Sequence, residues 1–194
     1  KVLNGPNPLG MVIGHELSPR SELGWLVSNH LIRQGAWDCV QDSIAIHQDI
    51  TLLTGQKTGR IWSDEQAAHV TLEDGRVLKA RLLVAADSRL STTRRAMGLA
   101  ADMYDFGRSM LVCCMLHQKP HHHVAWQWFD YGQTLALLPM NDDPATGMHR
   151  SSIVLTLPSH AIDPVANMAA PAFNAEIARR FAQRLGSMTL ASTR

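Results

Sequence analysis

Residues 81–95 read RLLVAADSRLSTTRR, and this stretch decides the fold. Its apolar run, residues 82–86, predicts a β-strand that is buried on both faces, as strands of parallel sheets are. Asp87 follows at the end of this strand, and after a short turn Ser91 and Arg94 begin a helix. A carboxylate between a strand end and a helix start can accept hydrogen bonds from a ribose, while the helix N-terminus favours phosphate. The stretch therefore indicates a nucleotide-binding site.

The composition is that of an ordinary globular protein. The 194 residues, 45% of them hydrophobic and 18% charged, suffice for one large domain or two small ones. With a formal net charge of +1, bulk charge gives no reason to expect a nucleic-acid or membrane partner. The odd count of 3 cysteines argues against a disulfide framework and favours a reducing cytoplasm. The sequence contains neither a signal peptide nor an apolar run of transmembrane length, and its abrupt ends lead us to expect an internal segment of a longer protein.

Local patterns divide the chain near residue 104. In the first part, Asn29 is the expected N-cap of a helix over residues 30–40. We also expect a short strand near residues 11–14 and, after the helix, four strands before the apolar run, over residues 50–53, 58–62, 67–73 and 76–79. The second part predicts four more strands, a loop and a helix, over residues 110–117, 124–130, 134–140, 152–157, 158–170 and 172–185. We therefore expect an α/β nucleotide-binding portion in residues 1–104 and an antiparallel sheet domain with a C-terminal helix in residues 105–194.

Residues 83–95 resemble the second fingerprint of the flavoprotein aromatic hydroxylases, the family of p-hydroxybenzoate hydroxylase. That fingerprint is an apolar strand, then Gly-Ala-Asp-Gly, then a Ser and an Arg that are three positions apart. This chain has AADS at residues 85–88, and Ser91 and Arg94 follow with the same spacing. The first and last residues of AADS stand where the family prefers Gly.

Further stretches resemble the same family. Residues 23–31 and 71–75 look like its helix near the flavin's adenosine and its hairpin. Residues 128–139 look like the substrate-domain sheet of the ubiquinone-biosynthesis hydroxylases, closest to the demethoxyubiquinol type. The resemblance implies an α/β (α+β) fold, with part of an FAD/NAD(P)-binding α/β domain and an antiparallel substrate-binding sheet. The family's Gly-rich dinucleotide fingerprint and its Gly-Asp flavin motif do not occur in these residues, so the stretch at 81–95 can form only half of a flavin site.

The resemblance also implies an FAD-dependent monooxygenase with NAD(P)H as cosubstrate. In this family NAD(P)H reduces the flavin, oxygen adds to it as a hydroperoxide, and one oxygen atom passes to an electron-rich aromatic ring. The protein supplies position, a dry cavity and electrostatics. We therefore expect no catalytic side chain and no metal. The expected substrate is a small aromatic molecule, a prenylated quinol of the demethoxyubiquinol type.

Five residues are candidates for cofactor binding: Asp87, Ser88, Arg94, Asn29 and Thr58. The resemblance places Asp87 against the dinucleotide, and Arg94 could meet a pyrophosphate with both arms of its guanidinium. Ser88 adds a side chain where glycine would let the backbone approach a phosphate. Asn29 matches a position near the pyrophosphate, and Thr58 a strand position near the adenine. Read without the family, Asp87 and Asn29 are helix caps, and the other positions are ordinary surface or strand residues.

Three residues are candidates for substrate contact: Trp126, Trp128 and Cys113. The two tryptophans share one face of the expected strand, and in the family this sheet covers the aromatic substrate. Cys113 and Cys114 alternate across a strand, so at most one of them faces the cavity. Core packing is the alternative for each candidate.

The histidine-rich tract, His117 with residues 121–123, suggests either weak metal binding or a polar hairpin loop. Three consecutive side chains converge poorly on one ion, so we expect the loop and no metal.

Two other functions stay open beside the ubiquinone-biosynthesis hydroxylase. One is a flavin hydroxylase of another phenolic substrate, and the other is a non-catalytic segment that binds a protein partner. We expect no nucleic-acid partner and a cytoplasmic location. Because the expected substrate is lipid-soluble, this hypothesis includes peripheral association with a membrane or with a biosynthetic complex.

Overall fold

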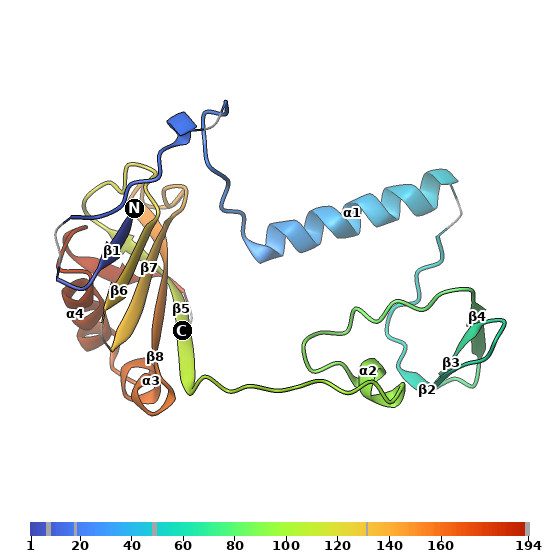
Figure 1. The fold of residues 1–194 in the computed structure, drawn as a ribbon. Coiled ribbons are helices and arrows are strands. Elements are labelled where there is room, and N and C mark those ends of the chain that lie inside the picture. Colours follow the sequence, from blue (N-terminus) through green and yellow to red (C-terminus); the bar gives the residue numbers. More distant parts are fainter. Residues whose placement is uncertain (7–8, 18, 48–49, 131, 193–194) are drawn as a thin grey trace. The chain divides into compact units, whose positions relative to one another are not determined.

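The computed structural model describes residues 1–6, 9–17, 19–47, 50–130 and 132–192, which form two compact units (Figure 1). The sheet unit comprises Lys1–Ser28 and Asp105–Arg194, and the hairpin unit comprises Asn29–Tyr104. The expected grouping of residues 1–28 with the first domain needs correction, because strand β1 (Val2–Asn4) pairs with β6 (Trp126–Asp130) of the sheet unit. The assignment of the two units to cofactor and substrate stays a prediction.

A six-stranded sheet forms the sheet unit, in the order β1-β6-β7-β8-β5-β9. Besides β1 and β6, its strands are β7 (Gln133–Pro139), β8 (His149–Pro158), β5 (Arg108–His117) and β9 (Met188–Leu190). Strands β6, β7, β8 and β5 pair antiparallel, which confirms the strands predicted for the second half of the chain. Strand β1 joins β6 in parallel at one edge.

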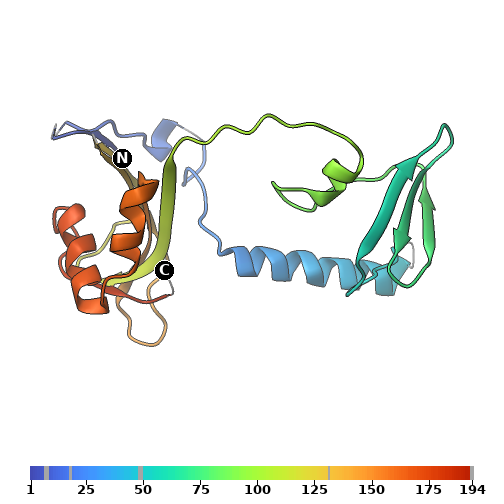
Figure 2. The ribbon, with the colours of Figure 1, turned by 90° about the horizontal axis from the view of Figure 1, so that it is seen from below.

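Helices α3 (Ser159–Ala166) and α4 (Ala170–Arg180) cover one face of this sheet (Figures 1 and 2). Phe173 and Ile177, one turn apart on α4, are 0% exposed and pack into the core. The strands contribute every second residue to that core: Leu111, Cys113, Met115, Leu135, Leu137, Ile153, Leu155 and Leu157. Helix α3 occupies residues that the sequence predicts as a loop, and it contains Pro164 in its interior, a residue that disfavours helix in the sequence pattern.

Neither α3 nor α4, the α-helices of the sheet unit among the described residues, covers the opposite face of the sheet, and we call it the open face (Figure 1). Met110 and Val112 on this face are 68% and 51% exposed. Val112 pairs with Val154, and Val154 pairs with Ala136, so an apolar row crosses three strands. An exposed apolar sheet face is typical of a surface that receives a ligand or another domain.

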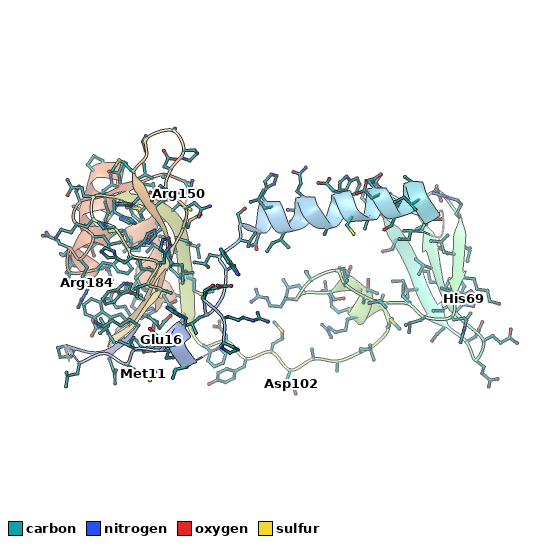
Figure 3. All side chains as sticks on the ribbon, turned by 90° about the horizontal axis from the view of Figure 1, so that it is seen from above. Met11, Glu16, His69, Asp102, Arg150 and Arg184 are labelled. Atoms are coloured by element: carbon teal, nitrogen blue, oxygen red, sulfur yellow. The ribbon has the colours of Figure 1, made fainter. Side chains whose placement is uncertain are left out.

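The hairpin unit consists of α1 (Asn29–His47), β2 (Thr58–Ser63), β3 (Ala68–Leu72), β4 (Val77–Ala80) and α2 (Thr92–Ala96). The predicted helix and the strands at residues 58–62, 67–73 and 76–79 are confirmed, although Asn29 is the first residue of α1 instead of the residue before it. The strands expected near residues 11–14 and at residues 50–53 do not form, since Met11 makes only an isolated bridge with Val2 and residues 50–53 have no strand partner among the described residues. A small core joins Ile61, Val70 and Leu72 to Leu83. The side chains of α1 project around the helix and most are exposed (Figure 3).

The apolar run at residues 82–86 is not a strand. Leu82 and Val84 are 75% and 74% exposed. A strand of a parallel sheet needs neighbouring strands to pair its backbone groups, and none of the described residues supplies such a neighbour for this run. The prediction of a buried strand is therefore wrong for this structure, although the run leads into the turn at Asp87 as expected.

Candidate functional site

Asp87 organises the turn that begins helix α2. Its Oδ1 accepts a hydrogen bond from the Ser91 hydroxyl, and its Oδ2 accepts one from the Thr93 amide at 3.0 Å. The Thr92 hydroxyl donates to the same Oδ2 at 3.2 Å. The Ser91 oxygen accepts the Arg94 amide at 2.9 Å and so caps the helix. The structure thus shows Asp87 in a capping role, the alternative that its position allows without the family.

The same hydrogen bonds keep Asp87 charged. Those from Ser91 and from the Thr93 amide hold the pKa of the Asp87 carboxyl well below its ordinary value. The side chain remains exposed, and each carboxylate oxygen can accept more than one hydrogen bond. The carboxylate is therefore still able to accept a hydrogen bond from a ribose hydroxyl.

Ser88 adopts a backbone conformation that favours glycine. Its φ is 93°, and its carbonyl accepts the Ser91 amide at 3.1 Å. A residue with a side chain pays on the order of 1 kcal/mol for such a conformation. The strain lies at the position where the resemblance predicts glycine, so the turn has a backbone that suits glycine there although the residue is Ser.

The remaining cofactor candidates are spread over the hairpin unit. Arg94 belongs to the Asp87 turn, where its guanidinium donates to the Leu99 carbonyl and holds the chain after α2. Thr58 lies in β2, which contacts α2. Asn29 begins α1 and is exposed. Of the five candidates, the structure therefore brings three together in one turn and places the other two on separate elements.

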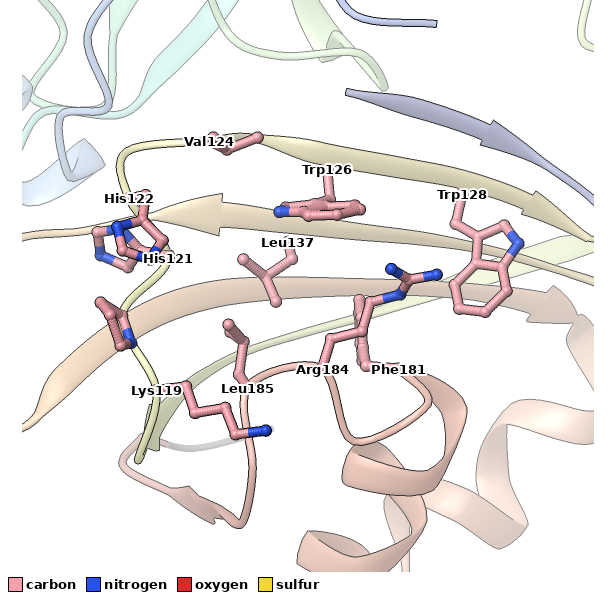
Figure 4. A pocket seen from close by; sticks show the side chains of 11 residues that line it. Lys119, His121, His122, Val124, Trp126, Trp128, Leu137, Phe181, Arg184 and Leu185 are labelled. Atoms are coloured by element: carbon pink, nitrogen blue, oxygen red, sulfur yellow. The ribbon is translucent and has the colours of Figure 1, made fainter. Parts of the chain in front are cut away.

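The substrate candidates lie on the helix-covered side of the sheet. Cys113 is 3% exposed and belongs to the core, whereas Cys114 alternates toward the open face. Trp126 and Trp128 pack at the edge of the core and line a pocket of about 470 Å³ (Figure 4). Contact between Cys113 and a substrate has no support in this structure, because core packing accounts for its position.

His117 and His121 are buried beside His149, whereas His122 and His123 are exposed in the loop that the sequence predicts between β5 and β6. His117 is 1% exposed, and its Nε2 lies 2.9 Å from the Ser151 hydroxyl. His121 is 6% exposed, and its ring centroid lies 5.7 Å from that of His117 and 6.2 Å from that of His149. Burial lowers the pKa of both His117 and His121. Within the described residues, no group of three or more His, Cys, Asp or Glu side chains is arranged to hold a metal ion.

Each ring nitrogen of His121 has a defined role. Its Nε2 lies 3.0 Å from the Met140 carbonyl and must donate there. Its Nδ1 accepts the His123 amide at 3.1 Å and therefore carries no proton. These two hydrogen bonds therefore require the neutral form of the His121 ring, with its proton on Nε2. Sequence reasoning missed this cluster because His149 comes from a distant strand.

None of the helices in the described part of the chain combines the length and apolar character that a membrane crossing requires.

Comparison with known proteins relates the chain to the ubiquinone hydroxylases. No protein-family model matches it. It is 36% identical over 197 residues to ubiquinone hydroxylase UbiM of Neisseria meningitidis, an alignment that covers 100% of this chain and 41% of that protein. It is 25% identical over 167 residues to the 3-demethoxyubiquinol 3-hydroxylase of Escherichia coli, which covers 86% of this chain and 40% of that protein.

Solved structures share the fold at low sequence identity. PqsL of P. aeruginosa, in a mutant form, superposes with a TM-score of 0.59 at 19% identity, over 81% of this chain and 46% of PqsL. HpxO of Klebsiella pneumoniae, complexed with FAD and uric acid, superposes with a TM-score of 0.51 at 20% identity, over 80% of this chain and 37% of HpxO.

The match to UbiM extends over the whole chain, which spans about two fifths of the length of the curated relatives named above. Ubiquinone hydroxylase UbiM and the 3-demethoxyubiquinol 3-hydroxylase are therefore homologues of this chain, which matches about two fifths of each of them.

Proposed function

We propose that the chain is part of an FAD-dependent monooxygenase that hydroxylates the aromatic ring of an intermediate in ubiquinone biosynthesis. The observation that carries the proposal is the 36% identity with ubiquinone hydroxylase UbiM over all of this chain. The turn at Asp87 supports it, because this turn keeps the carboxylate, the spacing and the glycine-type backbone of the flavin fingerprint.

Asp87 is the residue that we propose to hold the nucleotide. Its exposed, negatively charged carboxylate fits a ribose hydroxyl, and the backbone at Ser88 has a positive φ of the kind that glycine adopts where the backbone closely approaches a ligand. When bound, FAD supplies the redox chemistry, with NAD(P)H as electron donor and O2 as the source of the transferred oxygen. Asn29, Thr58 and Arg94 remain proposals for the same cofactor.

The open face of the sheet unit is the surface that we propose for the substrate ring. It presents Val112, Ala136 and Val154, an apolar row that would keep water from a bound aromatic molecule. Arg150 of β8, next to buried Ser151, has an Nε that is buried without a hydrogen-bond partner among the described residues. Such a donor is suited to an oxygen substituent on the ring. We assign the substrate contact expected for Cys113 to its neighbour Cys114, because adjacent residues of a strand face opposite sides of the sheet.

A prenylated quinol of the demethoxyubiquinol type is the substrate that the proposal names. The relatives' names support the quinol, and the apolar open face suits a hydrophobic ring. Because a prenyl tail partitions into lipid, we also propose that the protein works in the cytoplasm at a membrane surface, alone or in a biosynthetic complex.

The test is a purification of the protein expressed from its complete reading frame. We expect it to retain FAD, visible in its absorbance spectrum, and to oxidise NAD(P)H faster with a prenylated quinol than with an unprenylated phenol. A preference for the unprenylated phenol would favour a hydroxylase of another phenolic compound. A protein that takes up no FAD and hydroxylates neither substrate would contradict the proposal and favour the non-catalytic binding segment.

A further inference from the structure

The pocket on the helix-covered side of the sheet is separate from both proposed sites. It has a volume of about 470 Å³, within the range that holds small molecules (Figure 4). Its walls are apolar, with Trp126, Trp128 and Leu137 from the sheet and Phe181 and Leu185 from the segment after α4. The open face lies on the other side of the same sheet, and the residues that line the pocket include none of the Asp87 turn.

Positive charge gathers at the pocket without acidic partners. Arg184 and Lys119 line it, and no described lining residue is acidic. The Arg184 guanidinium lies 5.0 Å from the ring centroid of Trp126 and 5.3 Å from that of Trp128 (Figure 4). The Lys1 ammonium lies 5.0 Å from the same Trp126 ring. A negatively charged group in the pocket would therefore meet cations that no described carboxylate neutralises.

Backbone strain is concentrated around the same pocket. Five non-glycine residues of the described chain have a positive φ, and four of them flank it: His122, His123, Ala182 and Gln183. The first pair belongs to the loop that contributes the lining residues 119–122 and 124, and the second pair immediately precedes Arg184. Hydrogen bonds hold both pairs, since the Gln183 amide donates to the Ala178 carbonyl at 2.8 Å and the His123 amide to the His121 ring. Strain of this kind is typical of ligand-binding segments.

We propose that this pocket binds an aromatic carboxylate. The indole faces of Trp126 and Trp128 suit a planar ring, because aromatic pairs gain from stacked and edge-to-face contact. The planar guanidinium of Arg184 suits a carboxylate, which it can bind with two parallel hydrogen bonds, and Lys119 adds a second positive charge. The inference goes beyond the proposed monooxygenase and does not depend on it.

The test follows the indole N–H signals of the 5 tryptophans of the purified full chain by NMR, assigned with single Trp→Phe variants. The probe is 2-naphthoate, and 2-naphthalenemethanol is its neutral analogue. We expect naphthoate to shift the signals of Trp126 and Trp128 saturably and to bind about tenfold more tightly than the alcohol, the size of one charge-assisted hydrogen bond. The substitution R184Q should weaken naphthoate about tenfold and leave the alcohol unchanged.

Arg60 provides the matched control. Its guanidinium lies 5.1 Å from the ring of Trp62 in the hairpin unit, the same type of pair as at the pocket, so R60Q should leave naphthoate binding unchanged. Equal affinity for acid and alcohol, equal effects of R184Q and R60Q, or shifts confined to Trp25, Trp37 and Trp62 would overturn the proposal. Should R184Q disturb the fold, K119Q decides in its place, with weaker naphthoate binding expected. No flavin enters the measurement, so its failure would leave the monooxygenase proposal intact.

Discussion

At the scale of the residue, Ser88 holds a conformation that its side chain disfavours. Its φ of 93° is one that glycine adopts freely. We predict that Ser88→Gly stabilises the chain by about 0.5–1 kcal/mol, because relief of the strain exceeds the entropy that glycine adds to the unfolded state. Urea unfolding measures the change. The control is Ser63→Gly at the end of β2, where the same substitution should destabilise. A loss of stability in both variants would show that the turn at Ser88 is unstrained.

His121 gives the sheet unit a predicted dependence on pH. Its Nδ1 accepts a hydrogen bond from the His123 amide. Burial is the main cause that lowers its pKa, the neighbouring His123 and His149 lower it further, and the negative charge of Asp142 opposes this change. The folded pKa is therefore lowered, and the native state binds fewer protons than the unfolded chain below about pH 6.5. His117 acts in the same direction.

We expect the free energy of unfolding to be highest above about pH 6.5 and to decrease progressively as the pH falls toward the lowered pKa values of the folded chain. Urea unfolding at pH 7.5 and at pH 5.5 measures the loss, which should be smaller in His121→Gln. The exposed His160 of α3 is the control position, and His160→Gln should keep the pH dependence of the parent chain. Identical pH profiles for the parent and both variants would refute the role of the cluster.

Asp87 is the residue on which the cofactor proposal depends. We predict that Asp87→Asn weakens FAD binding about tenfold or more in the protein expressed from its complete reading frame, because a charged acceptor is lost. Asp74→Asn is the matched control, since Asp74 is also an exposed turn residue of the hairpin unit whose pKa is lowered by hydrogen bonds from Arg76. A fluorescence titration with FAD measures both variants. Equal affinities would leave Asp87 with its capping role alone.

At the scale of the element, the sequence predicts what local pattern and turn chemistry determine. The strands at 58–62, 110–117 and 152–157 alternate or end in tight turns, and they form as expected. Strand β1, of three residues, depends on pairing with β6 more than a hundred residues later, and no local pattern encodes this. The apolar run at 82–86 is the reverse case. Its local pattern is that of a strand, but it forms none, because the described residues include no neighbouring strand with which it could pair.

The candidate site also combines features that the local sequence predicts with features that depend on the folded structure. The spacing of Asp87 and Arg94 is local, and the structure places both in one turn as the pattern predicts. The face on which Cys113 lies depends on strand register and on which side α4 covers, and neither is a property of the local sequence. The aromatic and cationic pocket escapes prediction because Trp126 and Arg184 meet only in the folded sheet unit.

Helix α4 contributes two fully buried side chains, Phe173 and Ile177, to the core of the sheet unit. Phe173 is 0% exposed, and we predict that Phe173→Ala lowers the free energy of unfolding by about 3–5 kcal/mol through lost burial and a cavity. Met110, on the open face of the same sheet, is 68% exposed, and Met110→Ala should change it by less than about 1 kcal/mol. Thermal or urea unfolding compares the two. A similar cost for both would mean that the open face is covered in solution.

At the scale of the whole molecule, the chain consists of two compact units with different amounts of buried apolar surface. The sheet unit has a continuous core, whereas the hairpin unit leaves Leu82, Val84 and most of α1 exposed. The relatives are longer, and the chain spans about two fifths of their length. Large exposed apolar areas mark surfaces that contact other protein segments or ligands. The hairpin unit therefore has exposed apolar surface of the kind that other protein segments or a ligand cover.

The origin of the transferred oxygen tests the central claim most directly. The protein from the complete reading frame is supplied with FAD, NAD(P)H, a prenylated quinol and isotopically labelled O2, and the product is analysed by mass spectrometry. The account predicts a product that carries a single labelled oxygen on its aromatic ring, because a monooxygenase transfers one atom of O2 to the ring. A ring oxygen that derives from water, or an unchanged quinol in the presence of bound FAD and NAD(P)H, would contradict it.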